Sequence, residues 1–283
     1  MTGWRQAGPL TPAAEVQQRL WDSDPGGWAL FAEPHTQPLF EALLEVTSAG
    51  AGTRLLDVGC GSGLMMALAG RRGAAVTGID VAPGLLTVAS GRLPDAELWL
   101  ADMERLPFPD ESFDVIVGVN SFQFAGDPLG ALREAARVCR PGGAVAVSTF
   151  AEPERSESTA VHLAMSALSP PERQSEHEPY SLSAPGNLEL GLAAAGLRVT
   201  GIGEVECEWR YDTLAGALRG LLSSAGGARA AQDSSREAVS AAIESAVIPF
   251  TDPASGMISM RNVFRWVCAS KPRASKPLAS TPG

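Results

Sequence analysis

Residues 55–63 of the chain read LLDVGCGSG, an apolar run that ends in an acidic residue and continues into three glycines at every second position. Strong helix formers occupy residues 64–69, and Gly70 follows as a residue suited to the left-handed end of a helix. This order predicts a strand, a glycine loop and a helix in succession. Glycines let the backbone turn sharply and let a ligand approach without a Cβ in the way. We therefore expect a ligand against this loop, the alternative being a glycine turn without one.

The spacing of the glycines separates this loop from the dinucleotide-binding fingerprint, which reads G-x-G-x-x-G. Counted from Gly59 the third glycine falls on Leu64, and counted from Gly61 it falls on Met66. The pattern here is G-x-G-x-G. The loop therefore argues against a nicotinamide-dependent dehydrogenase.

Composition and charge narrow the functional class. With 283 residues, 45% hydrophobic and 19% charged, the chain has the composition of a soluble globular protein. The net charge of −10 opposes binding to nucleic acid, which depends on Lys and Arg neutralising phosphates. No apolar run approaches the roughly 18 residues of a membrane span, and the first twenty residues are too polar for a secretory signal. We expect a cytoplasmic protein with no membrane or nucleic-acid partner.

The cysteines and histidines predict no metal site. The four cysteines are far apart, with no C-x-x-C pair, and the three histidines are isolated in sequence. We expect reduced thiols. The residues are Cys60, Cys139, Cys207, Cys268, His35, His162 and His177.

Between residues 50 and 150 apolar strands alternate with helical stretches. Asp127 is a good N-cap and Pro128 fits the first helical position, so we expect a helix over 129–139, stopped by the Pro-Gly-Gly sequence at 141–143. Strands separated by such helices imply right-handed crossovers and a doubly wound, mostly parallel sheet covered on both faces. The expected strands after the first are 74–80, 97–101, 113–120 and 144–150, and a second helix is expected at 83–93.

Polar residues stand at the carboxyl ends of these strands, where ligands bind in parallel sheets. Asp57 ends the first strand, Asp80 the second, Asp102 the third and Asn120 the fourth. We expect these side chains to face one site.

The flanking segments differ from this core. Before the core we expect helices at 13–21 and 37–47 and a turn at 24–27. After the core, residues 151–180 are rich in Pro, Ser and Glu, which indicates an inserted lid, and we expect a helix in it at 159–168. Further helices are expected at 186–195, 213–222 and 235–247, and strands at 199–210 and 258–269. The expected divisions are an N-terminal helical extension (1–48), a ligand-binding core (49–150), a lid insertion (151–185), the C-terminal half of the sheet with inserted helices (186–270) and a disordered tail (271–283).

Five segments, taken in order, resemble the class I S-adenosylmethionine-dependent methyltransferases. They are 55–63, 76–81, 101–108, 113–120 and 132–150. The sequences of residues 102–108 and 140–143 most resemble those of the small-molecule branch that includes the ubiquinone and menaquinone methyltransferases (type 11). The rest of the chain resembles that branch only loosely. The resemblance implies a seven-stranded Rossmann-like sheet with a helical lid, and S-adenosylmethionine as the cofactor of the core.

The resemblance also implies contacts at the adenosine end of the cofactor. Asp80 would accept both ribose hydroxyls, Asp102 the adenine amino group, and the Met103 backbone N–H would meet a ring nitrogen, while Val81 and Leu85 supply apolar surface against adenine. The alternative roles are a helix cap for Asp80 and a turn residue for Asp102.

At the methionine end, the loop would contact the cofactor through its backbone, at Gly59, Cys60, Gly61 and Gly63. Asp57 would orient the loop or hold the amino group through water. Asn120 would present its carbonyl to the methionyl ammonium, unless it only ends its strand in a turn. Trp28 and Phe31 are expected either to cover the cofactor or to pack onto the core.

Methyl transfer needs few catalytic side chains, because the methyl group of a sulfonium is already activated and the acceptor nucleophile mainly has to be held in line with it. A base is needed only when the acceptor must lose a proton. His162, on the expected lid helix, is the possible base, the alternative being a surface histidine; His177 lies between two glutamates and is expected in solvent. Four residues are expected either to line the acceptor pocket or to serve in packing or lie exposed: Gln123, Phe124, Tyr180 and Tyr211.

Taken together, these expectations predict a methyltransferase that transfers the methyl group to a small, partly apolar metabolite by in-line displacement. Two alternatives stay open, namely a non-methylating reaction such as cyclisation or decarboxylation on the same cofactor, and a non-catalytic subunit that retains the fold. The acceptor, the methylated atom and the oligomeric state are not determined by the sequence.

Overall fold

The computed structural model describes residues 3–174, 180 and 182–273 of the chain. His177 lies outside these residues, and so does the expected disordered tail from residue 274 onward. Lys271 does not belong to such a tail, because its backbone exchanges hydrogen bonds with Gly142 and Gly143.

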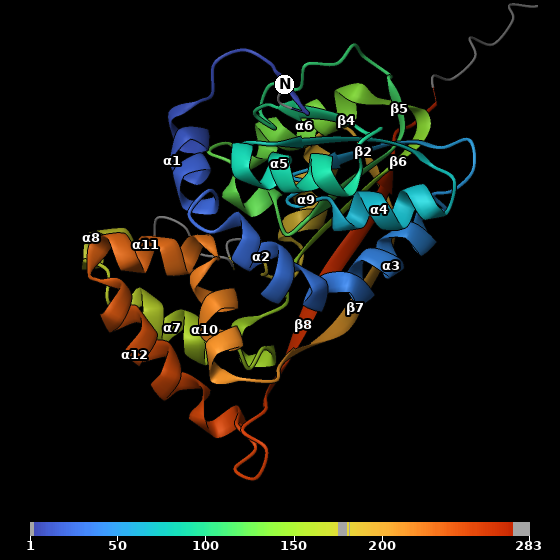
Figure 1. The fold of residues 1–283 in the computed structure, drawn as a ribbon. Coiled ribbons are helices and arrows are strands. Elements are labelled where there is room, and N and C mark those ends of the chain that lie inside the picture. Colours follow the sequence, from blue (N-terminus) through green and yellow to red (C-terminus); the bar gives the residue numbers. More distant parts are fainter. Residues whose placement is uncertain (1–2, 175–179, 181, 274–283) are drawn as a thin grey trace, which may run out of the picture.

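A twisted sheet runs through the molecule (Figure 1). It has eight strands in the order β1-β4-β3-β2-β5-β6-β8-β7. Neighbouring strands are parallel from β1 to β6, whereas β8 is antiparallel to both β6 and β7. The expected doubly wound, mostly parallel sheet is confirmed. The strands are β1 (Arg5–Gln6), β2 (Arg54–Val58), β3 (Ala75–Asp80), β4 (Glu97–Leu100), β5 (Phe113–Val119), β6 (Cys139–Phe150), β7 (Arg198–Tyr211) and β8 (Ile258–Ser270).

Strand β1 makes the sheet one strand wider than the seven expected. Arg5 and Gln6 pair in parallel with Trp99 and Leu100 of β4, and the Arg5 guanidinium lies 2.9 Å from the Glu97 carboxylate. A strand of two residues is too short to show an alternating pattern. Only the tertiary contact with β4 reveals it.

Helices cover both faces of the sheet. Ile116 and Val117 are neighbours in β5, and because side chains alternate along a strand they belong to two different apolar clusters. Ile116 packs with helices α6 and α9, whereas Val117 packs with α3 and α4. The helices up to the end of β6 are α1 (Pro12–Trp21), α2 (Pro25–Phe31), η1 (Glu33–Thr36), α3 (Gln37–Val46), α4 (Leu64–Arg71), α5 (Pro83–Arg92), η2 (Phe122–Phe124) and α6 (Pro128–Val138).

The cap predicted for α6 is confirmed, since the Asp127 carboxylate accepts a hydrogen bond from the Gly130 backbone N at 2.9 Å. The turn expected at 24–27 is wrong. Asp24 caps helix α2 by accepting from the Gly27 backbone N at 2.8 Å, and Pro25 fits the first helical turn. Helix α4 also continues through Gly70, and the left-handed residue is Gly73, with φ +88°. Strand β6 begins at residue 139, across the Pro-Gly-Gly sequence expected to precede it.

A cluster of helices at one end of the sheet comes from two separate chain segments (Figure 1). Helix α7 lies in the expected lid, and its Val161 and Met165 pack with Leu221 of α10 and Ile243 of α12. Helix α11 was not expected, because its sequence AGGARAAQD has few large apolar residues to mark a helical face. The remaining helices are η3 (Pro153–Arg155), α7 (Thr159–Ser166), α8 (Pro171–Gln174), α9 (Asn187–Ala194), α10 (Leu214–Leu222), α11 (Ala225–Asp233), α12 (Arg236–Val247) and η4 (Ile248–Phe250).

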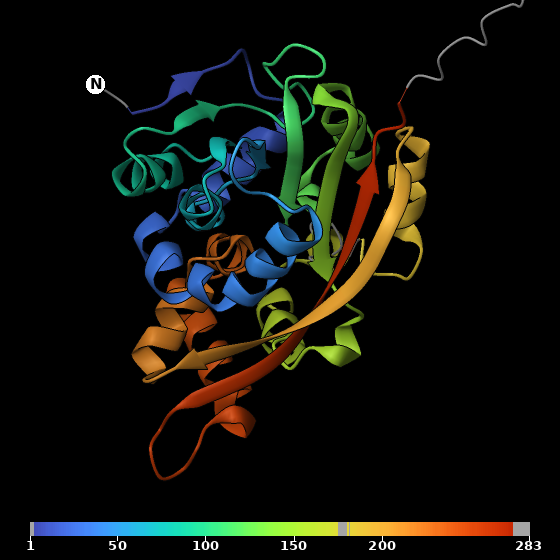
Figure 2. The same cartoon turned by 90° about the vertical axis from the view of Figure 1, so that its right-hand side faces the viewer.

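Strands β7 and β8 pair as a long twisted ribbon that reaches from the sheet toward these helices (Figure 2). Trp209 and Tyr211 lie near the end of β7, opposite Met260 and Ile258 of β8. The ribbon thereby brings the side chains of Trp209 and Tyr211 to the cavity at the carboxyl ends of the parallel strands.

Candidate active site

A cavity among the described residues opens at the carboxyl ends of the parallel strands and continues between α7, α10 and β7. It brings together fourteen of the sixteen residues expected at the site: Asp57, Gly59, Cys60, Gly61, Asp80, Val81, Leu85, Asp102, Met103, Asn120, Gln123, Phe124, His162 and Tyr211. Gly63 and Tyr180 do not line it. The Tyr180 hydroxyl lies 3.0 Å from the Nδ1 of His162, which does line it.

The glycine loop is held in a conformation that favours glycine at each of its three positions. Gly59, Gly61 and Gly63 have φ values of +77°, +54° and +82°. A Cβ on Gly59 would come within 2.5 Å of the Ser121 Cβ. At Gly63 a Cβ would stand 3.1 Å from the Ala89 Cβ. Gly63 therefore serves the packing of α4 on α5, and only the first two glycines face the cavity.

The Asp80 carboxylate joins β3 to this loop. Its Oδ2 accepts a hydrogen bond from the Gly61 backbone N at 2.8 Å, and its Oδ1 accepts from the Ala82 backbone N at 2.9 Å. Burial raises the pKa of Asp80, and the backbone hydrogen bonds oppose that rise. Ala82 is the residue that precedes α5, so the second of these bonds lies at the N-terminus of that helix.

Asp57 is a buried carboxylate with an unused oxygen. It is 2% exposed, and its Oδ2 has no hydrogen-bond partner among the described residues. Burial raises the pKa of Asp57 well above its ordinary value, and the nearby charges of Glu33 and Asp80 raise it further. A buried carboxylate in this state indicates a missing donor.

Glu33 is a cavity residue that sequence reasoning missed. It accepts a hydrogen bond from the Ser62 backbone N at 3.1 Å and a short one from the Ser62 Oγ, and it pairs with the Arg92 guanidinium at 2.7 Å. No motif marks Glu33, because it lies 29 positions before Ser62 in the chain. The only signal was its place just after Trp28 and Phe31, which were expected near the cofactor.

Asp102 is engaged by protein on both oxygens. Its Oδ1 accepts from the Glu104 backbone N at 2.9 Å, as expected of a turn residue, and its Oδ2 accepts from the Thr11 backbone N at 3.0 Å. Thr11 is the N-cap of α1. Asp102 therefore connects the N-terminal helix to the cavity, a contact that no local pattern predicts.

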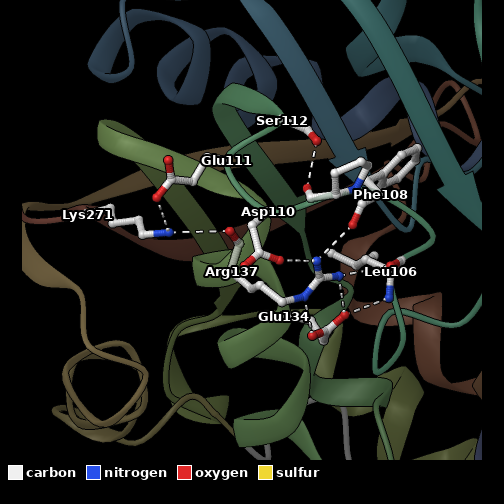
Figure 3. A network of polar contacts seen from close by, with 9 residues as sticks. Leu106, Phe108, Asp110, Glu111, Ser112, Glu134, Arg137 and Lys271 are labelled. Carbon is white, nitrogen blue, oxygen red and sulfur yellow. Dashed lines mark hydrogen bonds and ion pairs between the residues drawn. The ribbon is translucent and has the colours of Figure 1, made fainter.

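The loop after Asp102 is fastened by helix α6 (Figure 3). The Arg137 guanidinium donates to the carbonyl oxygens of Phe108 and Leu106 at 2.8 and 3.0 Å, and Glu134 accepts from the Leu106 backbone N at 2.9 Å. Hydrogen bonds to Arg137 lower the pKa of Glu134. This network holds the loop beside the cavity without facing it.

Asn120 ends β5 in the left-handed region, with φ +51°. Its backbone N donates to the Ser148 carbonyl at 3.2 Å, and its Oδ1 accepts from the Ser148 Oγ at 3.3 Å. Positive φ at a residue other than glycine is a strain often found at functional sites.

His162 lines the far part of the cavity, so the surface alternative is not what the structure shows. It is half-buried, and its Nδ1 lies 3.0 Å from the Tyr180 hydroxyl, which also lies 2.7 Å from the Thr159 hydroxyl. Burial lowers the pKa of His162 to about 4, so the ring is neutral at pH 7. Tyr180 therefore stands behind His162 instead of lining the pocket.

Aromatic side chains form much of the wall. The Trp21 ring packs edge-on against Trp28 and Phe124, with centroids 4.8 and 5.6 Å apart. Trp28 lines the cavity, whereas Phe31 does not; its ring lies under the Arg219 guanidinium instead. Near His162 the wall is completed by Phe150, Trp209, Tyr211 and Phe264.

The described residues contain no group of three or more His, Cys, Asp or Glu side chains arranged to hold a metal ion. The four cysteines are buried and unpaired. Among the same residues, no helix is long and apolar enough to cross a bilayer.

Comparison with known proteins relates the part of this site around the glycine loop to a family. Residues 56–147 match the model of a family described as "Methyltransferase domain". An uncharacterized protein of Mycobacterium tuberculosis is 36% identical over 150 residues, which cover 50% of this chain and 54% of that protein. A demethylmenaquinone methyltransferase of Tropheryma whipplei is 42% identical over 107 residues, covering 37% of this chain and 45% of that protein. The chain thus spans about half the length of the curated relatives it matches.

Among solved structures, the [4+2]-cyclase SpnF superposes with a TM-score of 0.59 at 22% identity, covering 94% of this chain and 99% of that one. This likeness concerns the fold. Residues 56–147 belong to the methyltransferase-domain family, and the chain has the fold of the class I S-adenosylmethionine-dependent methyltransferases.

Proposed function

We propose that the chain transfers the methyl group of S-adenosylmethionine to a small, partly apolar acceptor bound in the cavity. The observation that carries this proposal is the buried Asp57 Oδ2, unpartnered among the described residues and repelled by Glu33 and Asp80. Three carboxylates around one glycine loop favour a ligand with positive charge and N–H donors. S-adenosylmethionine carries both an ammonium and a sulfonium group.

The residues present fit this cofactor. Gly59 and Gly61 leave the loop free of Cβ atoms, and Asp57 would accept a hydrogen bond from the amino-acid end. Asp80 would keep its loop contact and accept the ribose hydroxyls on its remaining lone pairs, since a carboxylate has about four acceptor sites. At the adenosine end the proposed contacts are Val81, Leu85, Asp102 and Met103, and at the methionine end Cys60 and Asn120.

When bound, the cofactor supplies a methyl group that is already activated. The protein then needs to place the acceptor in line and exclude water. The aromatic wall at Phe150, Trp209 and Phe264 would hold an apolar acceptor, with Gln123, Phe124 and Tyr211 as further proposed contacts.

We assign His162 the role of holding or accepting a proton of the acceptor. Its Nδ1 is engaged by Tyr180, which leaves Nε2 for the acceptor. The Thr159 hydroxyl donates to the Pro153 carbonyl oxygen, so the Tyr180 hydroxyl donates to Thr159 and accepts from the Nδ1–H of His162. In this neutral tautomer the lone pair lies on Nε2, which needs to lose no proton first.

Methyl transfer itself is the test. The protein would be incubated with methyl-labelled S-adenosylmethionine and a panel of quinols, phenols and aliphatic hydroxy compounds, followed by extraction and mass spectrometry. We expect a labelled product from at least one acceptor class. Cofactor binding with altered but unmethylated acceptor would point to the non-methylating alternative, and an inert protein that binds no cofactor would point to the non-catalytic one.

A further inference from the structure

Gln17 carries a carboxamide that the described protein leaves without a partner. It lies in α1, is 4% exposed and lines the cavity. Neither its Nε2 nor its Oε1 has a hydrogen-bond partner among the described residues. Burying an unsatisfied amide costs free energy, so such a group in a cavity wall indicates a ligand that satisfies it.

One face of α1 is turned toward this cavity. Ala14, Gln17 and Trp21 follow one another at spacings of three and four, the spacing of one helix face, and all three line the cavity. The sequence alone placed α1 in an N-terminal extension. In the structure it is a wall of the site.

Three hydrogen bonds tie α1 to the part of the cavity assigned to adenosine. The Thr11 backbone N donates to Asp102 Oδ2 at 3.0 Å, and the Gln18 Nε2 donates to the Val81 carbonyl oxygen at 2.8 Å. The Oδ1 of Asp22, the residue after α1, accepts a hydrogen bond at 2.6 Å from the backbone N of Gly84 in the first turn of α5. Asp102 and Val81 are the residues proposed to meet adenine, so α1 is fixed directly over that end.

We propose that Gln17 binds the adenosine portion of S-adenosylmethionine and that α1 is therefore part of the cofactor site. This inference rests on the proposed function. A carboxamide offers two N–H donors and a carbonyl acceptor, which is the pattern that pairs with an adenine edge through its amino group and a ring nitrogen.

The acceptor side of the cavity is formed by other elements. His162 belongs to α7, Phe150 to β6, and Trp209 and Tyr211 to β7. Helix α1 packs against α11, where Leu20 contacts Ala225 and Ala228, and Leu20 and Ala225 line the cavity at this contact.

The test compares two ligands by titration calorimetry on the full chain. S-adenosylhomocysteine contains adenosine and the amino-acid end, whereas 5′-methylthioadenosine keeps only the adenosine and sulfur portion. Gln17→Leu and Gln17→Met remove the carboxamide with little change of volume. Gln37→Leu is the matched control, since Gln37 is exposed on α3 and does not line the cavity.

We expect both Gln17 variants to lose tenfold or more in affinity for both ligands by the same factor, while Gln37→Leu binds as the wild type does. Thermal unfolding of the ligand-free variants should not occur at a lower temperature, because the protein loses no hydrogen bond. Wild-type affinity in the Gln17 variants, or a loss confined to S-adenosylhomocysteine, would overturn the assignment to adenosine. Wild-type protein that binds neither ligand would instead overturn the proposed function.

Discussion

The Asp80 carboxylate accepts a hydrogen bond from the Gly61 backbone N at 2.8 Å, and this contact joins the end of β3 to the glycine loop that follows β2. One residue thus shapes the loop and faces the cavity. Its two oxygens are held by backbone donors, so the carboxylate is already oriented before a ligand arrives.

Replacing Asp80 by Ala should weaken binding of S-adenosylhomocysteine by more than tenfold, which is more than about 1.4 kcal/mol. The substitution removes the proposed ribose acceptor and frees the Gly61 N–H. Titration calorimetry would measure the loss, with Asp95→Ala, an exposed position outside the cavity, as the control. Unchanged affinity in a folded Asp80→Ala protein would remove Asp80 from the site.

Asp57→Asn should separate stability from binding. A folded-state pKa raised above the unfolded value means that the ionised side chain opposes folding, and the stability present below the ordinary carboxyl pKa is lost as pH rises through the raised value. Each unit of upward shift corresponds to about 1.4 kcal/mol. The ligand-free variant should therefore be more stable than the wild type at pH 7, with a flatter dependence of stability on pH, measured by urea unfolding.

The same variant should bind S-adenosylhomocysteine more weakly but keep its affinity for 5′-methylthioadenosine, which lacks the amino-acid end. Gln17→Leu, in contrast, should weaken binding of both ligands by the same factor. An equal loss for both ligands would mean that Asp57 acts through the loop and not on the amino group.

His162→Gln should lower kcat with little effect on binding of S-adenosylhomocysteine, since His162 lies in the acceptor part of the cavity. With a pKa of about 4, His162 should produce no inflection in the wild-type rate between about pH 6 and 8. Tyr180→Phe removes the hydroxyl on Nδ1 and should cause a smaller loss of kcat. Pre-steady-state methyl transfer across this pH range would check both; a wild-type inflection near pH 6.5 that disappears in His162→Gln would contradict the low pKa.

Arg137→Met should destabilise the protein by about 1–3 kcal/mol, because it breaks hydrogen bonds to the carbonyl oxygens of Leu106 and Phe108 and removes the positive charge paired with Glu134. Denaturant unfolding would measure this loss. Arg133→Met, on the exposed side of the same helix, is the control and should change stability by no more than about 0.5 kcal/mol.

Local patterns predicted much of the fold. The glycine loop, the Asp127 cap and the alternation of strands and helices each depend on neighbours in sequence, and their elements are confirmed within a few residues. Strand β1 was missed because two residues are too few to show a pattern, and helix α11 because it has few large apolar residues.

The residues of the candidate site also divide into those that the sequence could place and those that it could not. Asp57, Asp80, Asp102 and Asn120 could be placed at one edge because parallel strands end together. Glu33 and Gln17 could not, since their positions depend on how α1 and α2 fold back over the loop. Tyr180 was placed in the pocket, yet it supports His162 from behind.

Titration calorimetry of the wild-type protein with S-adenosylmethionine, S-adenosylhomocysteine and, as the control, NAD is the most direct test of the proposed cofactor. We expect micromolar binding of the first two and none of NAD. Absence of binding to all three, by protein shown to be folded, would contradict the proposed function and the cofactor contacts assigned to Asp57, Asp80 and Gln17.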